Sequence, residues 1–341
     1  MQNTKSKARI ITADIGGTNG RFAVVEVDHK TLNIVENVTF SCASFPSFTD
    51  MMQTFTNQIS DPVIKSAHLA IAGQTTANSA QITNIGWNFT SKDLQTATGL
   101  ESVSFMNDFA AVAQAIPCLK THEYKTLKPG QVMNDAPISI MGPGTGFGVA
   151  QLLKLDSGYK VISTEGGHTA FAPTTHLERD LWAHLKKSTE HICIESVLSG
   201  RGLARIHDFL VDYTGSGPKG LSPEEISATA VTGDTPSCVR AIQLFLSILG
   251  NVASDIVLTH GGRGGVWIAG GIIPQIYDLI ENSDFLIRFG AKGMMSSYLT
   301  NIPIHVITDA NAALIGAAAD WRGNQQMLQH QQYPVNATEG A

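Results

Sequence analysis

Two turns rich in glycine and threonine carry the strongest chemical signal in this sequence. The first reads Asp14-Ile-Gly-Gly-Thr-Asn19 and the second reads Gly142-Pro-Gly-Thr-Gly-Phe-Gly148. Glycine has no Cβ atom, so backbone N–H groups can approach a phosphate closely, and a threonine hydroxyl can donate to a phosphate oxygen. One such turn alone is typical of an ordinary hairpin. Two of them could hold a triphosphate from two sides, with Asp14 holding a hydrated Mg²⁺.

A third diglycine, Gly270-Gly271, closes the apolar run 264–269. The better-known phosphate loops do not occur in the sequence. It contains no G-x-x-x-x-G-K-[ST], and no G-x-G-x-x-G opens a helix with an acidic residue about 20 positions later. Phosphate binding would therefore depend on the paired turns and on this third diglycine.

Asn107-Asp108 stands between a predicted strand, 102–106, and a predicted helix that ends before Pro117. An aspartate at a helix N-terminus is kept ionised by the positive end of the helix dipole. Two interpretations remain open. The pair could simply cap the helix, or Asp108 could accept a proton from a sugar hydroxyl that attacks phosphorus.

Glu165 and His168 flank another diglycine, and Glu195 lies in the apolar stretch HICIESVLSG. A carboxylate and an imidazole so placed could hydrogen-bond the vicinal hydroxyls of a sugar. A zinc site is the competing interpretation, but no second His or Cys lies at ligand spacing. Glu195 taken alone is more typical of a solvated helix face.

The elements that must position these groups form a repeated pattern. Apolar runs precede and follow each glycine turn, so the sequence predicts two similar hairpins, and their similarity indicates a duplicated core with two lobes. Thr90-Ser91 should open a helix that stops near Gly99, and Ser222-Pro-Glu-Glu225 should cap another. A long helix is expected over 236–259, and a last helix from Asp309.

Composition limits the possible functions. The 341 residues favour about two domains. A net charge of −6 argues against a nucleic-acid partner. We find no polybasic anchor, signal peptide or apolar stretch of spanning length, so we expect no membrane association. The four cysteines form no C-x-x-C pair, which favours reduced thiols in the cytoplasm.

Together these motifs resemble those of bacterial glucokinases. The resemblance covers residues 10–322 and rests, in order, on DIGGTNGRFAV, NDFAAVAQAIP, GPGTGFGVA, EGGHTAFAP, ESVLSGRGL and GGVWIAGGI. It implies the actin-like ATPase (ribonuclease H-like) α/β fold, with a duplicated core, two lobes and a cleft between them. The small domain would comprise 9–118 plus 309–322 and the large domain 119–308, with flexible ends at 1–8 and 323–341. The related repressor and manno-kinase group usually carries a Cys-rich zinc motif, which this sequence lacks.

The resemblance also implies roles for individual residues. Asp108 would be the general base towards the 6-hydroxyl of glucose. The sugar ligands would be Asn107, Asp108, Glu165, His168 and Glu195. The ATP contacts would be Ala13, Asp14, Ile15, Gly16, Gly17, Thr18, Gly144, Thr145, Gly146, Gly270 and Gly271. Mg²⁺ would bridge the phosphates, with Asp14 reaching it through water.

The resemblance thus implies an ATP-dependent kinase that makes glucose 6-phosphate, the first step of glycolysis, and works as a cytoplasmic homodimer. Two alternatives stay open. The chain could phosphorylate another hexose, or it could be an actin-like ATPase without a sugar substrate. A regulator that binds sugar without catalysis is disfavoured in its DNA-binding form, because no helix-turn-helix extension precedes Arg9.

Overall fold

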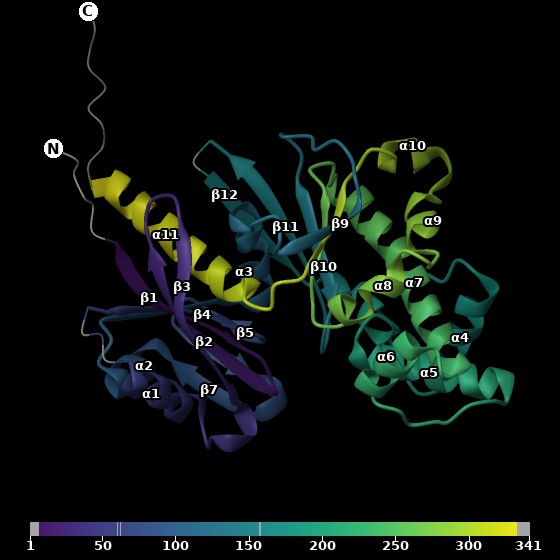
Figure 1. The fold of residues 1–341 in the computed structure, drawn as a ribbon, viewed down its shortest axis with the longest axis horizontal. Helices are drawn as coiled ribbons and strands as arrows, with labels where there is room; N and C mark the ends of the chain where they lie inside the picture. Colours follow the sequence, from purple (N-terminus) through teal and green to yellow (C-terminus); the bar gives the residue numbers. More distant parts are fainter. Residues whose placement is uncertain (1–6, 60, 62, 157, 333–341) are drawn as a thin grey trace, which may run out of the picture. The chain divides into compact units, whose positions relative to one another are not determined.

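The chain divides into two compact units in a computed structural model, which describes residues 7–332 except 60, 62 and 157 (Figure 1). The first unit is Met1–Lys120 with Ala310–Ala341, and the second is Thr121–Asp309. The chain therefore passes between the units one or two residues beyond the positions expected from the sequence.

A five-stranded sheet of order β3-β2-β1-β4-β8 forms the centre of the first unit. The first glycine turn joins β1 to β2 as an antiparallel hairpin, β3 extends it, and β4 and β8 run parallel to β1. The bounds are β1 (Ala8–Ile15), β2 (Asn19–Val27), β3 (Leu32–Ser41), β4 (Ser66–Ile71) and β8 (Ser102–Asn107). Because side chains alternate along a strand, Ile11 faces one layer of helices and Ile10 the other.

One face of this sheet packs, through Phe22 of β2, against an aromatic-rich layer that includes Phe48 and Phe89. That layer consists of α1 (Phe48–Gln58), α2 (Ser91–Thr98) and the small sheet β5 (Gln74–Thr75), β6 (Ser79–Ile82) and β7 (Trp87–Thr90). The predicted start and stop of α2 are confirmed, because Thr90 caps it in a capping box and Gly99 ends it in the left-handed conformation.

The other layer is formed by α3 (Asp108–Ala115) and α11 (Ala312–Gln332), which is yellow in Figure 1. A Cβ atom on Gly316 would lie 1.7 Å from the Ala111 carbonyl oxygen, so only glycine lets the two helices approach this closely. The contact fixes α3, and with it Asp108 at the helix start.

The expected limits of the last helix are wrong at both ends. It begins at Ala312 rather than Asp309, because the N–H groups of Thr308 and Asp309 both donate to the Glu123 carbonyl oxygen and hold that segment outside the helix. It continues to Gln332, through residues expected to be flexible. Residues 333–341 and 1–6 of the expected flexible ends lie outside the described residues.

The second unit repeats the sheet of the first. Its order is β12-β11-β10-β13-β14-β9, in which the second glycine turn joins the antiparallel hairpin β10–β11 and the next two strands run parallel to β10. The bounds are β9 (Tyr124–Lys128), β10 (Ile138–Pro143), β11 (Phe147–Leu155), β12 (Gly158–Thr164), β13 (Val266–Ile268) and β14 (Ile304–Ile307). The duplicated core predicted from the two hairpins is confirmed.

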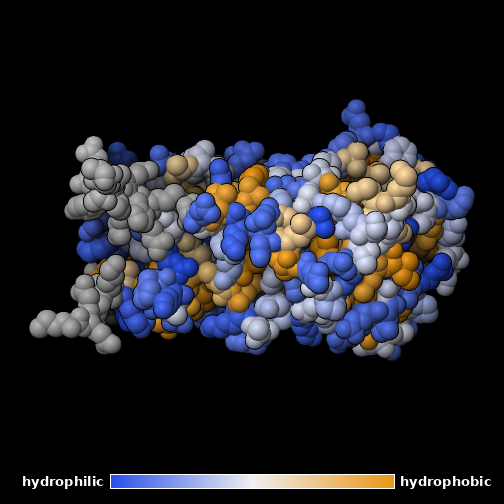
Figure 2. Space-filling model, turned by 90° about the horizontal axis from the view of Figure 1, so that it is seen from above, coloured by the Kyte–Doolittle hydropathy of each residue, from blue (hydrophilic) through white to orange (hydrophobic). Residues whose placement is uncertain are grey.

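The core of the second unit centres on α7 (Pro236–His260), close to its predicted bounds. By length and composition α7 could span a membrane, but 78% of its apolar window is buried inside the protein, as in a core helix. The remaining helices are α4 (His176–Lys186), α5 (Gly200–Thr214), α6 (Pro223–Thr232), α8 (Tyr277–Ile280), α9 (Phe285–Gly290) and α10 (Ser296–Leu299). On the face seen in Figure 2, hydrophilic residues lie among hydrophobic ones.

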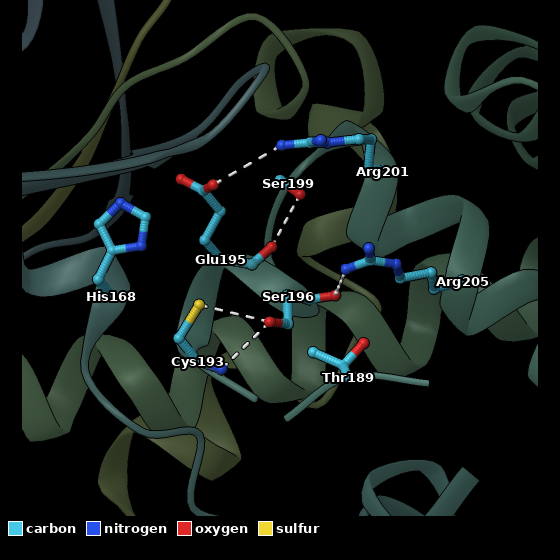
Figure 3. A pocket seen from close by; sticks show the side chains of 8 residues that line it. All are labelled: His168, Thr189, Cys193, Glu195, Ser196, Ser199, Arg201 and Arg205. Carbon is cyan, nitrogen blue, oxygen red and sulfur yellow. Dashed lines mark hydrogen bonds and ion pairs between the residues drawn. The ribbon is translucent and has the colours of Figure 1, made fainter. Parts of the chain in front are cut away.

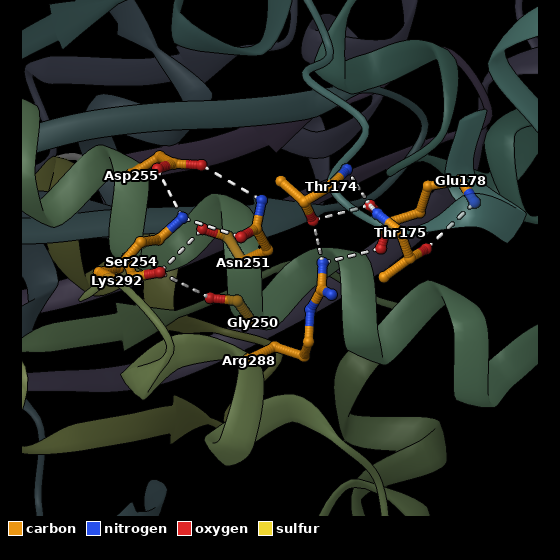
Figure 4. Close-up of polar contacts among 9 residues, drawn as sticks. All are labelled: Thr174, Thr175, Glu178, Gly250, Asn251, Ser254, Asp255, Arg288 and Lys292. Atoms are coloured by element: carbon orange, nitrogen blue, oxygen red, sulfur yellow. Dashed lines mark hydrogen bonds and ion pairs between the residues drawn. The ribbon is translucent and has the colours of Figure 1, made fainter. Parts of the chain in front are cut away.

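A buried carboxylate ties α4 to α9 (Figure 4). Glu178 is 1% exposed, and its Oε2 accepts hydrogen bonds from the N–H groups of Thr174 and Thr175. Arg288 donates to Oε1 of the same carboxylate at 2.8 Å. A second ion pair drawn in the same view, Lys292 with Asp255, is more exposed, because half of the Asp255 side chain surface meets solvent.

We expect Glu178→Ala to destabilise the second unit by about 3–5 kcal/mol, because it removes a fully buried carboxylate with its hydrogen bonds and leaves the mostly buried Arg288 charge without its partner. Asp255→Ala, which removes a half-exposed carboxylate, should cost less, about 1 kcal/mol, because Lys292 keeps its hydrogen bond to the Asn251 amide oxygen. Urea denaturation followed by circular dichroism would measure both. Equal losses in the two variants would contradict the importance given to burial.

Candidate active site

In the first unit, the glycine turn and Asn107-Asp108 leave the sheet at one edge. The strands β1, β4 and β8 are parallel, with Ile15 opposite Ile71 and Ile71 opposite Asn107. Their carboxyl ends therefore align. In open α/β sheets, ligands bind at this edge.

The first turn contains an internal ion pair. Within it the Gly16 N–H donates to the Asn19 carbonyl oxygen at 3.0 Å. Arg21 lies directly opposite Asp14 across the hairpin and donates to its Oδ2 at 3.0 Å. Removal from water raises the pKa of the Asp14 carboxyl, and the Arg21 guanidinium opposes that shift. The ion pair favours the charged form of the carboxyl and fixes its direction, although burial is the larger of the two effects on the pKa.

Asn107 caps α3, so the capping interpretation is correct for this residue. Its Oδ1 accepts from the N–H groups of Phe109 and Ala110, at 3.0 Å each. The Asp108 carboxylate occupies the first turn of α3 and accepts from the Phe109 N–H at 2.8 Å. Capping uses only the oxygen of the Asn107 amide, so its Nδ2 group can still donate to a ligand.

In the second unit, the second glycine turn and the third diglycine lie side by side. Gly144 and Gly146 close the β10–β11 hairpin, with the Gly144 N–H donating to the Gly146 carbonyl oxygen at 2.8 Å. Gly270 follows the neighbouring parallel strand β13, and a Cβ atom there would lie 2.2 Å from the Pro143 carbonyl oxygen. The structure thus brings both groups of predicted phosphate-binding glycines of this unit to one sheet edge.

The diglycine between Glu165 and His168 packs against β11. A Cβ atom on Gly167 would lie 2.2 Å from the Phe147 carbonyl oxygen, and one on Gly166 would lie 2.9 Å from the Val149 Cβ. This close approach explains why two glycines are needed here. Glu165 and His168 emerge on either side, with Oε2 and Nε2 4.0 Å apart, and both side chains are exposed.

Glu195 reaches the second glycine turn directly. It lies in a short 3-10 turn, Ile194–Ser196, and its Oε2 accepts from the Phe147 N–H at 2.9 Å. Its side chain is only 23% exposed, so the solvated helix face that its segment alone suggested is wrong. A cavity of about 190 Å³ adjoins it (Figure 3). The lining residues are His168, Thr189, Cys193, Glu195, Ser196, Ser199, Arg201 and Arg205.

Main-chain pairing sets the spacing of His168 and Glu195. The segment after His168 runs antiparallel to the segment before Glu195, with a bridge between Ala170 and Cys193. The Ile194 N–H donates to the Thr169 carbonyl oxygen at 3.0 Å. The imidazole and the carboxylate therefore border the same cavity although 27 positions separate them in the sequence.

The described residues contain no group of three or more His, Cys, Asp or Glu side chains suited to a metal. A Mg²⁺ ion that bridges substrate phosphates needs only one or two protein carboxylates. Asp14 supplies one carboxylate at the first turn. Arg21 and Arg201, each beside a carboxylate, are among the residues that sequence reasoning missed, although Arg21 ends the motif GGTNGR and Arg201 stands inside LSGRG.

Comparison with known proteins places these features in a family. The family model described as Glucokinase matches residues 11–323. This chain belongs to the glucokinase family. A glucokinase of Colwellia psychrerythraea is 37% identical over 328 residues, covering 94% of this chain and 98% of that protein. One of Campylobacter jejuni subsp. doylei is 38% identical over 319 residues, covering 93% and 95%.

Solved structures agree with this placement. A glucokinase from an Antarctic psychrotroph has 37% identity and a TM-score of 0.80, covering 92% of this chain and 98% of that one. A glucokinase of the ROK family from Streptomyces griseus, in complex with glucose and AMPPNP, has 20% identity and a TM-score of 0.63, covering 91% and 98%. The expected actin-like fold and the expected class, ATP-dependent hexose kinase, are confirmed for this glucokinase-family protein.

We expect Gly146→Ala to weaken glucose binding about 10-fold or more if Glu195 binds the sugar. The new Cβ would lie 2.4 Å from Glu195 Oε2, so the carboxylate must shift and its hydrogen bond to the Phe147 N–H is weakened or lost. Hydrogen bonds to charged groups are worth about 1.5–3 kcal/mol. Calorimetric titration with glucose, without nucleotide, measures the effect. Gly144→Ala is the matched control, because its Cβ would meet nothing within 4 Å; equal affinities in the two variants would contradict the prediction.

Proposed function

We propose that this protein is a glucokinase that transfers the γ-phosphoryl group of ATP to the 6-hydroxyl of glucose. The observation that carries this proposal is the hydrogen bond between the Glu195 carboxylate and the Phe147 N–H. It joins Glu195, a side chain suited to binding sugar hydroxyls, to Phe147, the first residue after the Gly144–Gly146 turn. Within one unit, a carboxylate suited to hydroxyls and a turn suited to phosphates form a single structure.

Sugar recognition in this proposal uses carboxylates, one imidazole and one amide. Glu165, His168 and Glu195 surround the start of β11, and carboxylates accept hydrogen bonds from vicinal hydroxyls. At the start of α3, Asn107 supplies the amide and Asp108 supplies a further carboxylate. An ATPase without a sugar substrate needs none of these ligands, which favours a hexose kinase.

Asp108 is the proposed general base. It would accept the proton of the 6-hydroxyl while that oxygen attacks phosphorus. The first turn of a helix favours the ionised carboxylate that this role requires. Phosphoryl transfer otherwise depends on positioning and on neutralising charge.

The nucleotide contacts in this proposal are the glycine groups at the two sheet edges. The segments Ala13–Thr18 and Gly144–Gly146 would hold the phosphates through those N–H groups that the hairpins do not use themselves, with Gly270-Gly271 beside the second turn. Asp14 would hold Mg²⁺ through water, and the ion would neutralise charge on the transferring group. Arg21 would orient Asp14 for that contact.

We also propose a cytoplasmic homodimer that performs the first step of glycolysis. The cysteines are all free thiols, three of them buried, which fits a reducing compartment. The lightly charged surface, with 15% charged residues in the chain, fits association between copies.

A coupled assay for hexose 6-phosphate, with ATP and Mg²⁺, tests the substrate. We expect strong turnover with glucose and much weaker turnover with mannose, fructose or glucosamine, because the ligand set fits the glucose hydroxyls. A no-sugar reaction should release little ADP. Preference for another hexose would retain the nucleotide site but reject the assigned sugar, and sugar-independent ADP release would favour the ATPase alternative.

We expect Asp108→Asn to lower kcat by roughly 10²–10⁴, the usual range for loss of a general base, while glucose still binds. Asp93→Asn is a matched control, because Asp93 also sits in the first turn of a helix of the same unit, where it completes the α2 capping box. Steady-state kinetics of both variants decides the role. A kcat within threefold of wild type for Asp108→Asn would remove Asp108 from catalysis.

A further inference from the structure

The cavity beside Glu195 contains two arginines that the proposed sugar ligands do not require. Both come from α5, one turn apart, and Figure 3 shows them on the same side of the cavity. Arg205 Nη1 donates to the Ser196 carbonyl oxygen at 3.3 Å. Arg201 is 74% exposed, and its Nη2 lies 4.0 Å from Glu195 Oε1, beyond hydrogen-bonding distance.

Arg201 is therefore the less committed of the two cations. The contact with Glu195 is its one polar contact among residues 7–332 that the structure describes. A guanidinium group carries five N–H donors in a planar fork, which matches carboxylate and phosphate oxygens. Its donors remain available to a ligand, whereas Arg205 is already engaged with the backbone.

The start of α5 places Arg201 next to the second glycine turn. The Gly200 N–H donates to the Gly144 carbonyl oxygen at 2.9 Å, so the helix begins in contact with the turn. Ser199 caps the helix by accepting from the Gly202 N–H and donates its own hydroxyl to the Glu195 carbonyl oxygen. Arg201 is the residue after Gly200, so its side chain begins next to the second glycine turn.

Glu195 divides its two oxygens between different neighbours. Oε2 is occupied by the Phe147 N–H at 2.9 Å, and Oε1 faces Arg201 at 4.0 Å. A sugar hydroxyl that donates to Glu195 would therefore use Oε1. The guanidinium would then gain more from a phosphate oxygen, because charge-assisted bonds from Arg to phosphate can be bidentate.

We propose that Arg201 binds the terminal phosphates of the nucleotide held by the Gly144–Gly146 turn, and so adds a cation to the phosphoryl-transfer site. This inference rests on the proposed function. Bound sugar occupies Glu195 Oε1 and leaves the guanidinium to the phosphates. An arginine so placed stabilises the charge that develops on the transferring group.

The test compares nucleotides that differ in their terminal phosphates. Calorimetric titrations of the full-length protein use AMP alone, glucose alone, and a non-hydrolysable ATP analogue with Mg²⁺ in the presence of saturating glucose. We expect Arg201→Ala to weaken binding of the ATP analogue roughly 10- to 100-fold, as for a lost charge-assisted hydrogen bond, with AMP and glucose unchanged. Arg201→Lys should recover part of the loss, because it keeps the charge without the planar fork.

Arg205→Ala is the matched control, since it removes the same side chain one turn along the same helix and should leave binding of the ATP analogue unchanged. An Arg201→Ala variant with wild-type affinity for the ATP analogue would overturn the proposal. A change in glucose affinity alone would also overturn it, because Arg201 would then act only on Glu195. Wild-type protein that neither binds the analogue nor phosphorylates glucose would instead reject the proposed function itself.

Discussion

The hydrogen bond from the Phe147 N–H to Glu195 Oε2, 2.9 Å long, is the interaction on which the second unit's site depends. Phe147 is the first residue of β11, and its carbonyl oxygen also receives the close approach of Gly167. Phe147 therefore positions Glu195 through its N–H group. Its carbonyl oxygen packs against the diglycine that lies between Glu165 and His168. Functional groups fixed to a strand in this way keep a more constant geometry than groups on loops.

Glycine makes this arrangement possible, because at each of these contacts the backbone packs directly against another backbone segment or against a carboxylate. Gly146 leaves room for the Glu195 carboxylate, and Gly270 leaves room for the Pro143 carbonyl oxygen. The same residues are the expected phosphate contacts. Close packing and phosphate approach are thus two consequences of one property, the missing Cβ atom, so a glycine motif by itself does not show which of the two it serves.

Local signals explain how much of the fold could be predicted from the sequence. The hairpins, the α2 caps and the α6 capping box at Ser222 all follow from residues within a few positions of one another. The extent of α11 could not be predicted from composition: its polar end continues a helix anchored by the Gly316–Ala111 contact. Glu195 was also beyond local patterns, because its partner Phe147 lies 48 positions away. Its proposed role came from the family resemblance, not from its segment.

Each glycine turn carries a carboxylate with an arginine beside it, although the two pairs arise differently. Asp14 and Arg21 face each other across a hairpin, so the antiparallel register alone brings them to 3.0 Å. Glu195 and Arg201 belong to successive turns of one segment and remain 4.0 Å apart. At a proposed phosphate site, a carboxylate repels the ligand that the site would bind. A neighbouring guanidinium offsets that repulsion, and the looser pair is the one whose cation can turn towards the phosphates at the smaller cost.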